Sequence, residues 1–190
     1  MSTQPKSAPS DRETAGPLDI SEVRQQTTVI DLGCMQVPVR DDVAVKLEVE
    51  ESTNRPLAIT LDAGNWQLQL QAFAAPKSAG IWHDVRAQIA SGITSSGGQI
   101  EERVGSLGPE LLAKMDVKDS NGKSVGVRMA RFVGVDGPRW FLRGLISGAA
   151  LTDPRSAADA DDLFRQIIVR RDETPVPPMD LLEIRIPNQG

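Results

Sequence analysis

The chain is 190 residues long, with 39% hydrophobic and 25% charged residues and a formal net charge of −5. This length fits one domain with a sizeable core, and the composition lies far from the disordered, collagen-like and membrane-embedded classes. The negative charge argues mildly against nonspecific binding to DNA or to a membrane surface. The charge is uneven, however, because the segment 123–171 carries nine basic and five acidic residues, which leaves −9 on the rest of the chain.

Cysteine usage and hydropathy favour a reducing compartment. Cys34 is the only cysteine, which excludes an intramolecular disulfide and a thiolate metal cluster. We expect its side chain to be buried and unreactive. The N-terminus lacks the apolar core of a secretory signal, and no stretch approaches the roughly 20 apolar residues that span a bilayer. We therefore predict a cytoplasmic protein without membrane contact.

Residues 1–27 are rich in Ser, Pro, Thr, Gln and charge and poor in large apolar side chains. Such a segment buries too little apolar surface to offset its ordering entropy, so it is expected to be a flexible tail. Structure is expected from residue 28 onward. The predicted organisation is thus a tail over 1–27 followed by a single α+β domain over 28–190.

Alternating hydrophobicity predicts strands in the first half of that domain. A β-rich run covers residues 28–32, and a second short strand ends at Pro38. Residues 43–50 alternate strictly, as expected of a half-buried strand. Residues 56–73 then give two strands around a turn at 63–65, with Trp66, Leu68 and Leu70 on one face and glutamines on the other. This pattern indicates a β-hairpin.

The period changes after Pro76. Ile81, Val85, Ile89 and Ile93 recur every four residues, which predicts an amphipathic helix ending at the glycine pair 97–98. Four strands joined by short turns follow, over 99–107, 110–119, 124–135 and 139–149. A second amphipathic helix is predicted from the Asp153-Pro154 start signal, followed by an extended C-terminal segment that could pair through residues 182–186. The predicted fold class is α+β: a mainly antiparallel sheet covered by two amphipathic helices, an α/β sandwich.

The chain lacks the common catalytic motifs. His83 is the only histidine, so paired-histidine and His-based zinc sites are excluded, and no G-x-S-x-G or glycine-rich phosphate loop occurs. The aspartates in the second helix, at 159, 161 and 162, suit its N-terminal dipole better than a calcium loop. We predict no enzyme activity, no metal and no cofactor.

The stretch GVDGPRWFLRG, residues 134–144, offers a candidate binding site. A hairpin tightened at 136–138 would bring arginines of two strands beside an aromatic ring, a combination suited to a base, a phosphate or a carboxylate. The candidate ligand-binding residues are Arg128, Arg131, Arg139, Trp140 and Arg143. The simpler interpretation, which we favour, pairs each arginine with a carboxylate such as Glu101, Glu102 or Asp136 and places Trp140 in the core.

Three strings, at 68–90, 134–154 and 163–178, together resemble an uncharacterised family of actinobacterial proteins, a domain of unknown function. They include AFAAPKSAGIW and GVDGPRWFLRG, which lie far apart and occur in the order found in that family. The resemblance covers about residues 28–187 and implies no activity or cofactor. The order of strands and helices is also similar to that of the Mog1/PsbP-like class, whose members act mainly in binding and assembly.

Three hypotheses for function remain open. The leading one is a non-enzymatic cytoplasmic interaction or assembly module that holds a protein partner. The alternative is a nucleotide or single-stranded nucleic-acid binding protein that uses the arginine and aromatic hairpin, with Trp140 or Phe141 as the stacking ring. A hydrolase or transferase that works with carboxylates alone is the third. The sequence leaves the partner and the oligomeric state open.

Overall fold

Seven strands form the main sheet of the computed structural model, which describes residues 4–187. Its spatial order is β4 (Ala44–Val49), β5 (Pro56–Asp62), β6 (Trp66–Ala74), β10 (Trp140–Gly148), β9 (Ser124–Gly137), β8 (Gly108–Lys118) and β7 (Gln99–Gly105). Every pair of neighbours is antiparallel. Sequential hairpins build the two halves, and pairing of β6 with β10 joins them, with Leu70 opposite Gly144 near the middle.

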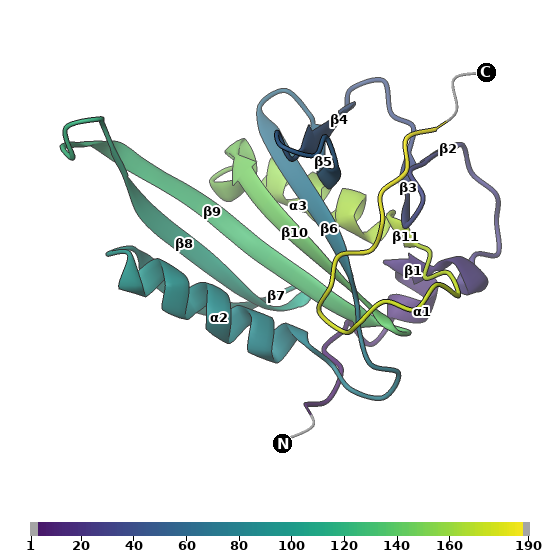
Figure 1. The fold of residues 1–190 in the computed structure, drawn as a ribbon. Coiled ribbons are helices and arrows are strands. Elements are labelled where there is room, and N and C mark those ends of the chain that lie inside the picture. The colour runs from purple at the N-terminus through teal and green to yellow at the C-terminus, as the bar shows by residue number, and fades with distance from the viewer. Residues whose placement is uncertain (1–3, 188–190) are drawn as a thin grey trace.

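A second, small sheet lies beside the first (Figure 1). Its order is β1 (Leu18–Asp19), β11 (Ile168–Val169), β3 (Met35–Pro38) and β2 (Val29–Asp31). The β1–β11 pair is parallel and the other two pairs are antiparallel. This sheet collects segments from the two ends of the chain, which the local pattern of hydrophobicity could not pair.

Helix α2 (Trp82–Ser95) lies on one face of the main sheet and contacts β7, β8 and β9 (Figure 1). Its first residue is the anchor, because the Trp82 ring stacks on Phe141 with ring centroids 5.4 Å apart. The pair fits only because Gly134 lies between them with no side chain: a Cβ there would meet the Trp82 ring at 2.6 Å. Farther along the helix, Val85, Ile89 and Ile93 are only partly buried.

The opposite face carries the larger core. Helix α3 (Pro154–Arg165) contributes Leu163 and Phe164, and the second sheet contributes Met35 and Val37, all fully buried. Asp153 caps the helix by accepting a hydrogen bond from the Ser156 N–H at 3.2 Å, and Pro154 follows it, as the sequence signal predicts.

The mixed α+β class and the antiparallel sheet are confirmed. The arrangement of the covering layers differs from the predicted sandwich, in which two helices alone cover the sheet. Helix α2 contacts strands at one end of the sheet, and α3 shares its layer with the second sheet. The strands predicted over 28–32 and up to Pro38 are β2 and β3, but they belong to the second sheet. That sheet was missed because β1 and β11, which complete it, are only two residues long, too short for an alternation to show.

Residues 4–22, within the segment predicted to be a flexible tail, form the N-terminal arm, which contains α1 (Arg12–Ala15), β1 and the 3-10 turn η1 (Ile20–Glu22). The Gly80 N–H donates to the Gln4 carbonyl at 2.9 Å, and the Asp136 N–H donates to the Ser7 carbonyl at 2.8 Å. The composition argument counted apolar burial alone, whereas polar contacts to distant residues hold the arm. Residues 1–3 of the predicted tail lie outside the described residues.

The extended C-terminal segment crosses from β6 to the second sheet (Figure 1). Phe73 bridges to Leu181 and Gly33 bridges to Ile184, so the expected pairing within residues 182–186 occurs through Ile184. Near the start of α3, the 3-10 turn η2 (Ala149–Leu151) follows β10. Within residues 4–187, no helix combines the length and the apolar character needed to cross a membrane.

Two glycine-to-alanine substitutions should have opposite effects on stability. Gly134→Ala forces a methyl group into the Trp82–Phe141 stack and should lower the free energy of unfolding by about 1–3 kcal/mol. Gly92→Ala lies within α2, where a Cβ meets nothing within 4 Å, and should raise it by about 0.5–1 kcal/mol. Urea unfolding of both variants measures the difference; equal stabilities would contradict this packing.

Candidate functional site

The turn between β9 and β10 is built around the buried carboxylate of Asp136, which is 2% exposed. Its Oδ1 accepts a hydrogen bond from the Ile81 N–H and its Oδ2 from the Ser7 N–H, each at 2.9 Å. Burial raises the pKa of Asp136, and the backbone donors Ile81, Ser7 and Trp82 oppose that rise. One carboxylate therefore holds the start of α2, the N-terminal arm and the turn together.

Trp140 also links this turn to the N-terminal arm. Its ring is fully buried, and its Nε1–H donates to Asp19 Oδ1 at 2.9 Å. The Arg12 guanidinium lies over the ring, 5.6 Å from its centroid, and pairs with both carboxylate oxygens of Glu22. Trp140 therefore lies in the core, as the simpler interpretation had it. None of its ring is exposed to a ligand.

Arg131 is also fully engaged. It is 5% exposed, and its Nε and Nη2 donate to the two oxygens of Glu110 at 2.7 and 2.9 Å. Its Nη1 donates to Asp161 Oδ1 of α3 at 2.6 Å. The arginine thus joins β8, β9 and α3 in a buried ion-pair network. Its carboxylate partners are Glu110 and Asp161, rather than a surface carboxylate such as the expected Glu101, Glu102 or Asp136.

Arg128 and Arg143 both face the side of the sheet on which α2 lies, but they are far apart. Arg143 pairs with Gly134, and Arg128 lies six residues earlier on β9, so about 20 Å separates them at ~3.4 Å per residue. Arg128 is exposed on the part of the β8–β9 hairpin that projects beyond the rest of the sheet (Figure 1). The two arginines therefore cannot grip one small ligand.

Arg143 lies in a very different environment from the other arginines. It is half-buried, its guanidinium lies 5.4 Å from the centroid of the Phe132 ring, and burial lowers its pKa. Among residues 4–187 it has no ion-pair or hydrogen-bond partner. A guanidinium that has lost part of its hydration and gained an aromatic ring but no anion is incompletely compensated, and an incoming anion would offset that cost.

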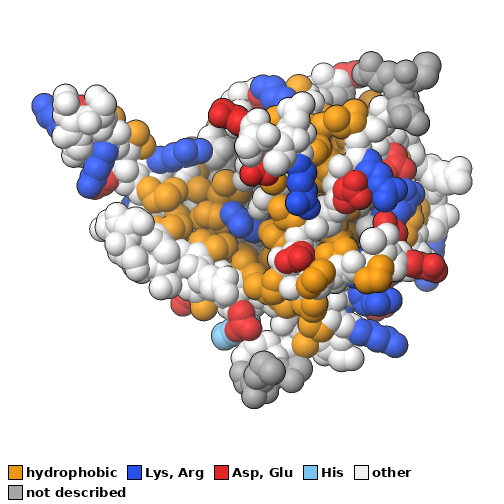
Figure 2. Space-filling model, in the orientation of Figure 1, with side chains coloured by type: hydrophobic (Ala, Val, Ile, Leu, Met, Phe, Trp, Pro, Cys, Tyr) orange, Lys and Arg blue, Asp and Glu red, His pale blue; other side chains and the backbone are white. Residues whose placement is uncertain are grey.

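Around Arg143 the sheet surface is open. We call the surface formed by Gln69, Gln71 and Phe73 of β6 with Arg143 and Leu145 of β10 the open face. Gln71 lies directly opposite Arg143 and Gln69 opposite Leu145, and all five side chains are only partly buried. Figure 2 looks onto this side of the molecule, where hydrophobic side chains gather in the middle around basic ones. The sequence signals for this surface were the alternation of glutamines in β6 and the candidate residue Arg143, but nothing in the sequence brought the two together.

Arg139 occupies the turn itself. Pro138 and Arg139 form the two-residue connection between Gly137 and Trp140, and Arg139 has φ +61°. Proline followed by a positive φ is the pattern of a type II turn, whose second central residue is normally Gly or Asn. An arginine in this conformation costs about 1–2 kcal/mol. Its side chain is exposed.

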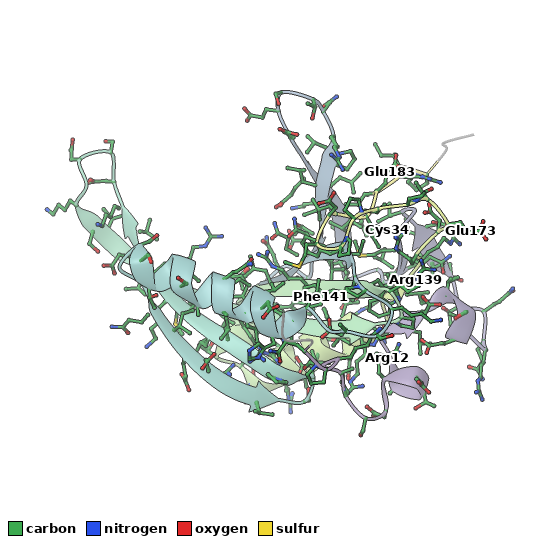
Figure 3. The ribbon with its side chains drawn as sticks, turned by 60° about the horizontal axis from the view of Figure 1, so that its bottom comes forward. Arg12, Cys34, Arg139, Phe141, Glu173 and Glu183 are labelled. Atoms are coloured by element: carbon green, nitrogen blue, oxygen red, sulfur yellow. The ribbon has the colours of Figure 1, made fainter. Side chains whose placement is uncertain are left out.

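A cavity of about 600 Å³ lies beside this turn. It is bounded by the N-terminal arm, by Lys77 and by the turn, and we call it the turn cavity. Figure 3 shows Arg139 and Arg12 on this side of the molecule and Phe141 near the start of α2. The five predicted site residues thus lie apart from one another. Arg131 lies in the buried network, Trp140 in the core and Arg139 at the turn cavity. Arg143 and Arg128 lie on the α2 side of the sheet, the first near its middle and the second at its far end.

The other candidate reactive groups lie apart from these places. Burial raises the pKa of the Cys34 thiol to about 12. His83 is exposed on α2. Within the described part of the chain, no group of three or more His, Cys, Asp or Glu side chains is arranged to hold a metal ion.

Comparison with known proteins gives a family. A family model described as "Protein of unknown function (DUF3710)" matches residues 16–190. The chain belongs to the DUF3710 family. No curated protein and no solved structure matches it. Membership of an uncharacterised family is therefore confirmed, and the DUF3710 match begins at Gly16, within the N-terminal arm. An actinobacterial origin and a Mog1/PsbP-like fold stay predictions.

Two arginine substitutions distinguish structural from solvent-exposed positions. Arg131→Ala leaves the buried Glu110 with only the partly exposed Arg103, 2.9 Å away, as counter-ion, and should lower the free energy of unfolding by about 3 kcal/mol, the lower end of the range for breaking a buried ion pair. Arg128→Ala, on the exposed hairpin, should change it by less than about 0.5 kcal/mol. Chemical denaturation measures both values; a mild effect at Arg131 would mean that the network contributes little.

Cys34 should resist thiol reagents. With a pKa of about 12 the thiol stays protonated at pH 8, and it is buried. Its reaction with Ellman's reagent should therefore be about two orders of magnitude or more slower in the native protein than in the denatured protein. The rate measured across a denaturant series should rise with the unfolded fraction, and fast labelling of the native state would show that the site is accessible.

Proposed function

We propose that this DUF3710 protein is a non-enzymatic cytoplasmic binding module whose open face holds an acidic, extended segment of a protein partner. The observation that carries the proposal is Arg143, a half-buried guanidinium without a partner among the described residues, in the middle of an otherwise apolar and amide-lined surface.

The chemistry of the open face favours a carboxylate-bearing peptide. Arg143 can donate two parallel hydrogen bonds to one carboxylate, and partial burial strengthens such a pair. Gln71 donates to the Leu57 carbonyl at 3.2 Å, which leaves its side-chain oxygen to accept from a peptide N–H. Phe73 and Leu145 supply apolar contact on either side of this polar pair. A chain that alternates acidic and apolar side chains matches this order.

The extent of the surface supports a peptide rather than a flat protein patch. Val85, Ile89 and Ile93 of α2 are partly buried, so the helix forms one wall of the open face. The C-terminal segment pairs with β6 through Leu181 and so extends the sheet beside Phe73. An extended peptide lying beside α2 could bury apolar side chains against the helix and against the sheet. The expected likeness to binding and assembly proteins of the Mog1/PsbP-like class agrees with this proposal.

The alternative of a nucleic-acid surface receives less support. The aromatic rings proposed to stack on bases, those of Trp140 and Phe141, are both fully buried. Sequence-tolerant binding of single strands relies on exposed rings and on a basic groove. The net charge of −5 further opposes a polyanion.

Peptide selection tests the proposal. The full chain is screened against a displayed library of random peptides, and the best binder is measured by fluorescence anisotropy with the wild type, Arg143→Met and Arg128→Met. Methionine keeps the apolar contact with Phe132 but removes the charge. We expect enrichment of Asp and Glu, and binding weakened about 10–100-fold by Arg143→Met alone, as for loss of a charge-assisted hydrogen bond.

Three results would contradict the proposal. One is enrichment of peptides without acidic residues, and another is equal affinity of the wild type and Arg143→Met. The third is a dimer in sedimentation experiments that Arg143→Met dissociates, which would assign the open face to a second copy of the chain.

A further inference from the structure

We propose that the turn cavity binds the phosphate group of a small phosphorylated molecule, which Lys77 and Arg139 hold. This site is separate from the open face and requires no peptide there. The argument rests on the charges that line the cavity, on the backbone of Arg139 and on the size of the space.

Three of the six charged groups that line the turn cavity already have partners. Arg12 pairs with Glu22 at 2.8 Å, and Lys6 Nζ donates to the Gly137 carbonyl at 2.6 Å. Asp136 directs both oxygens to backbone N–H groups. The remaining lining charges are the cations Lys77 and Arg139 and the carboxylate Glu13. Lys77 and Arg139 are exposed and make no ion pair with any residue in 4–187.

The backbone of Arg139 supplies an independent argument. At φ +61° glycine or asparagine would fit without the strain that a long side chain causes. The main-chain carbonyl there is already engaged, since it accepts from the Ala75 N–H at 3.0 Å. Among residues 4–187, the Arg139 side chain makes no hydrogen bond or ion pair that would repay the strain. Strained conformations of this kind cluster at ligand sites, and an anion on the guanidinium would supply the missing interaction.

The size of the cavity limits the ligand. About 600 Å³ lies in the range of small-molecule sites. An arginine and a lysine together suit a phosphate group, the first through paired donors and the second as a point charge. Two uncommitted cations are too few to hold a polyanion on a chain with a net charge of −5. These observations favour a phosphorylated metabolite or a mononucleotide over a nucleic acid.

Binding should also stabilise the N-terminal arm. Pro9, Ser10 and Glu13 of the arm line the same cavity as Lys77 and Arg139, so a ligand there would contact both the arm and the turn. A ligand that binds only the docked arm shifts its equilibrium toward docking. Hydrogen exchange of residues 4–22 should therefore slow when ligand is present.

The test uses the full chain at low ionic strength with inorganic phosphate, pyrophosphate and ATP as probes in calorimetric titrations. We expect saturable binding of at least one probe, weakened about 10-fold or more in Arg139→Gly and in Lys77→Met. The melting temperature of Arg139→Gly should equal or exceed that of the wild type, because glycine relieves the strain. Arg128→Ala, on the distant hairpin, is the matched control and should bind as the wild type does.

The three probes separate the possible sources of the phosphate. Binding of inorganic phosphate alone would indicate a free-phosphate site, whereas tighter binding of ATP would indicate a phosphorylated small molecule. The proposal is overturned by the absence of saturation with every probe, by Arg139→Gly binding as tightly as the wild type, or by an oligonucleotide that binds more tightly than ATP. Hydrogen exchange in the arm that does not respond to a bound probe would place that probe elsewhere.

Discussion

The Asp136 carboxylate is the constraint on which the arrangement of this protein depends. A buried carboxylate is tolerated only when donors surround it, and here the donors come from the arm at Ser7 and from the start of α2 at Ile81. Its two oxygens thereby fix where the helix begins, and the helix start places Trp82 over Gly134 and Phe141. The walls of both proposed sites follow from it, because α2 borders the open face and the arm borders the turn cavity.

Much of the fold could be predicted because it is local. Alternation and the fourfold spacing located the long strands and both long helices, and the start of α3 at Asp153-Pro154 needed only the identity of neighbouring residues. The docking of the arm and the pairing of the second sheet could not be predicted in this way, although two of its strands, β2 and β3, were. Asp19 binds Trp140 across 121 positions of sequence, and β1 pairs with β11 from the other end of the chain. Short segments held by long-range polar contacts leave no periodic signal.

For the candidate site too, the sequence predicted what is local and missed the contacts between distant residues. Strand alternation correctly separated Arg131 from Arg128 and Arg143, since it assigns odd and even positions to opposite faces. Alternation could not identify which helix or side chains pack against each face of the sheet. Glu110 lies 21 positions from Arg131, and Asp161 lies 30 positions from it on a helix that packs on the opposite side from α2. Arginines that look alike in the sequence therefore lie in different surroundings: Arg131 in a buried ion-pair network, Arg143 on an open surface and Arg139 in a strained turn.

The contrast among these arginines is itself an argument about function. At Arg131 every local requirement is met: the charge is buried, neutralised and multiply hydrogen-bonded, so stability alone explains it. The Arg143 guanidinium is partly buried without a counter-ion, and Arg139 has a backbone conformation that suits glycine better than a long side chain. Sequences that specify a fold agree with it at every level, and departures from that agreement concentrate where a protein does something other than fold. One departure lies on the open face and the other beside the turn cavity, and each is relieved by the same kind of partner, an anion.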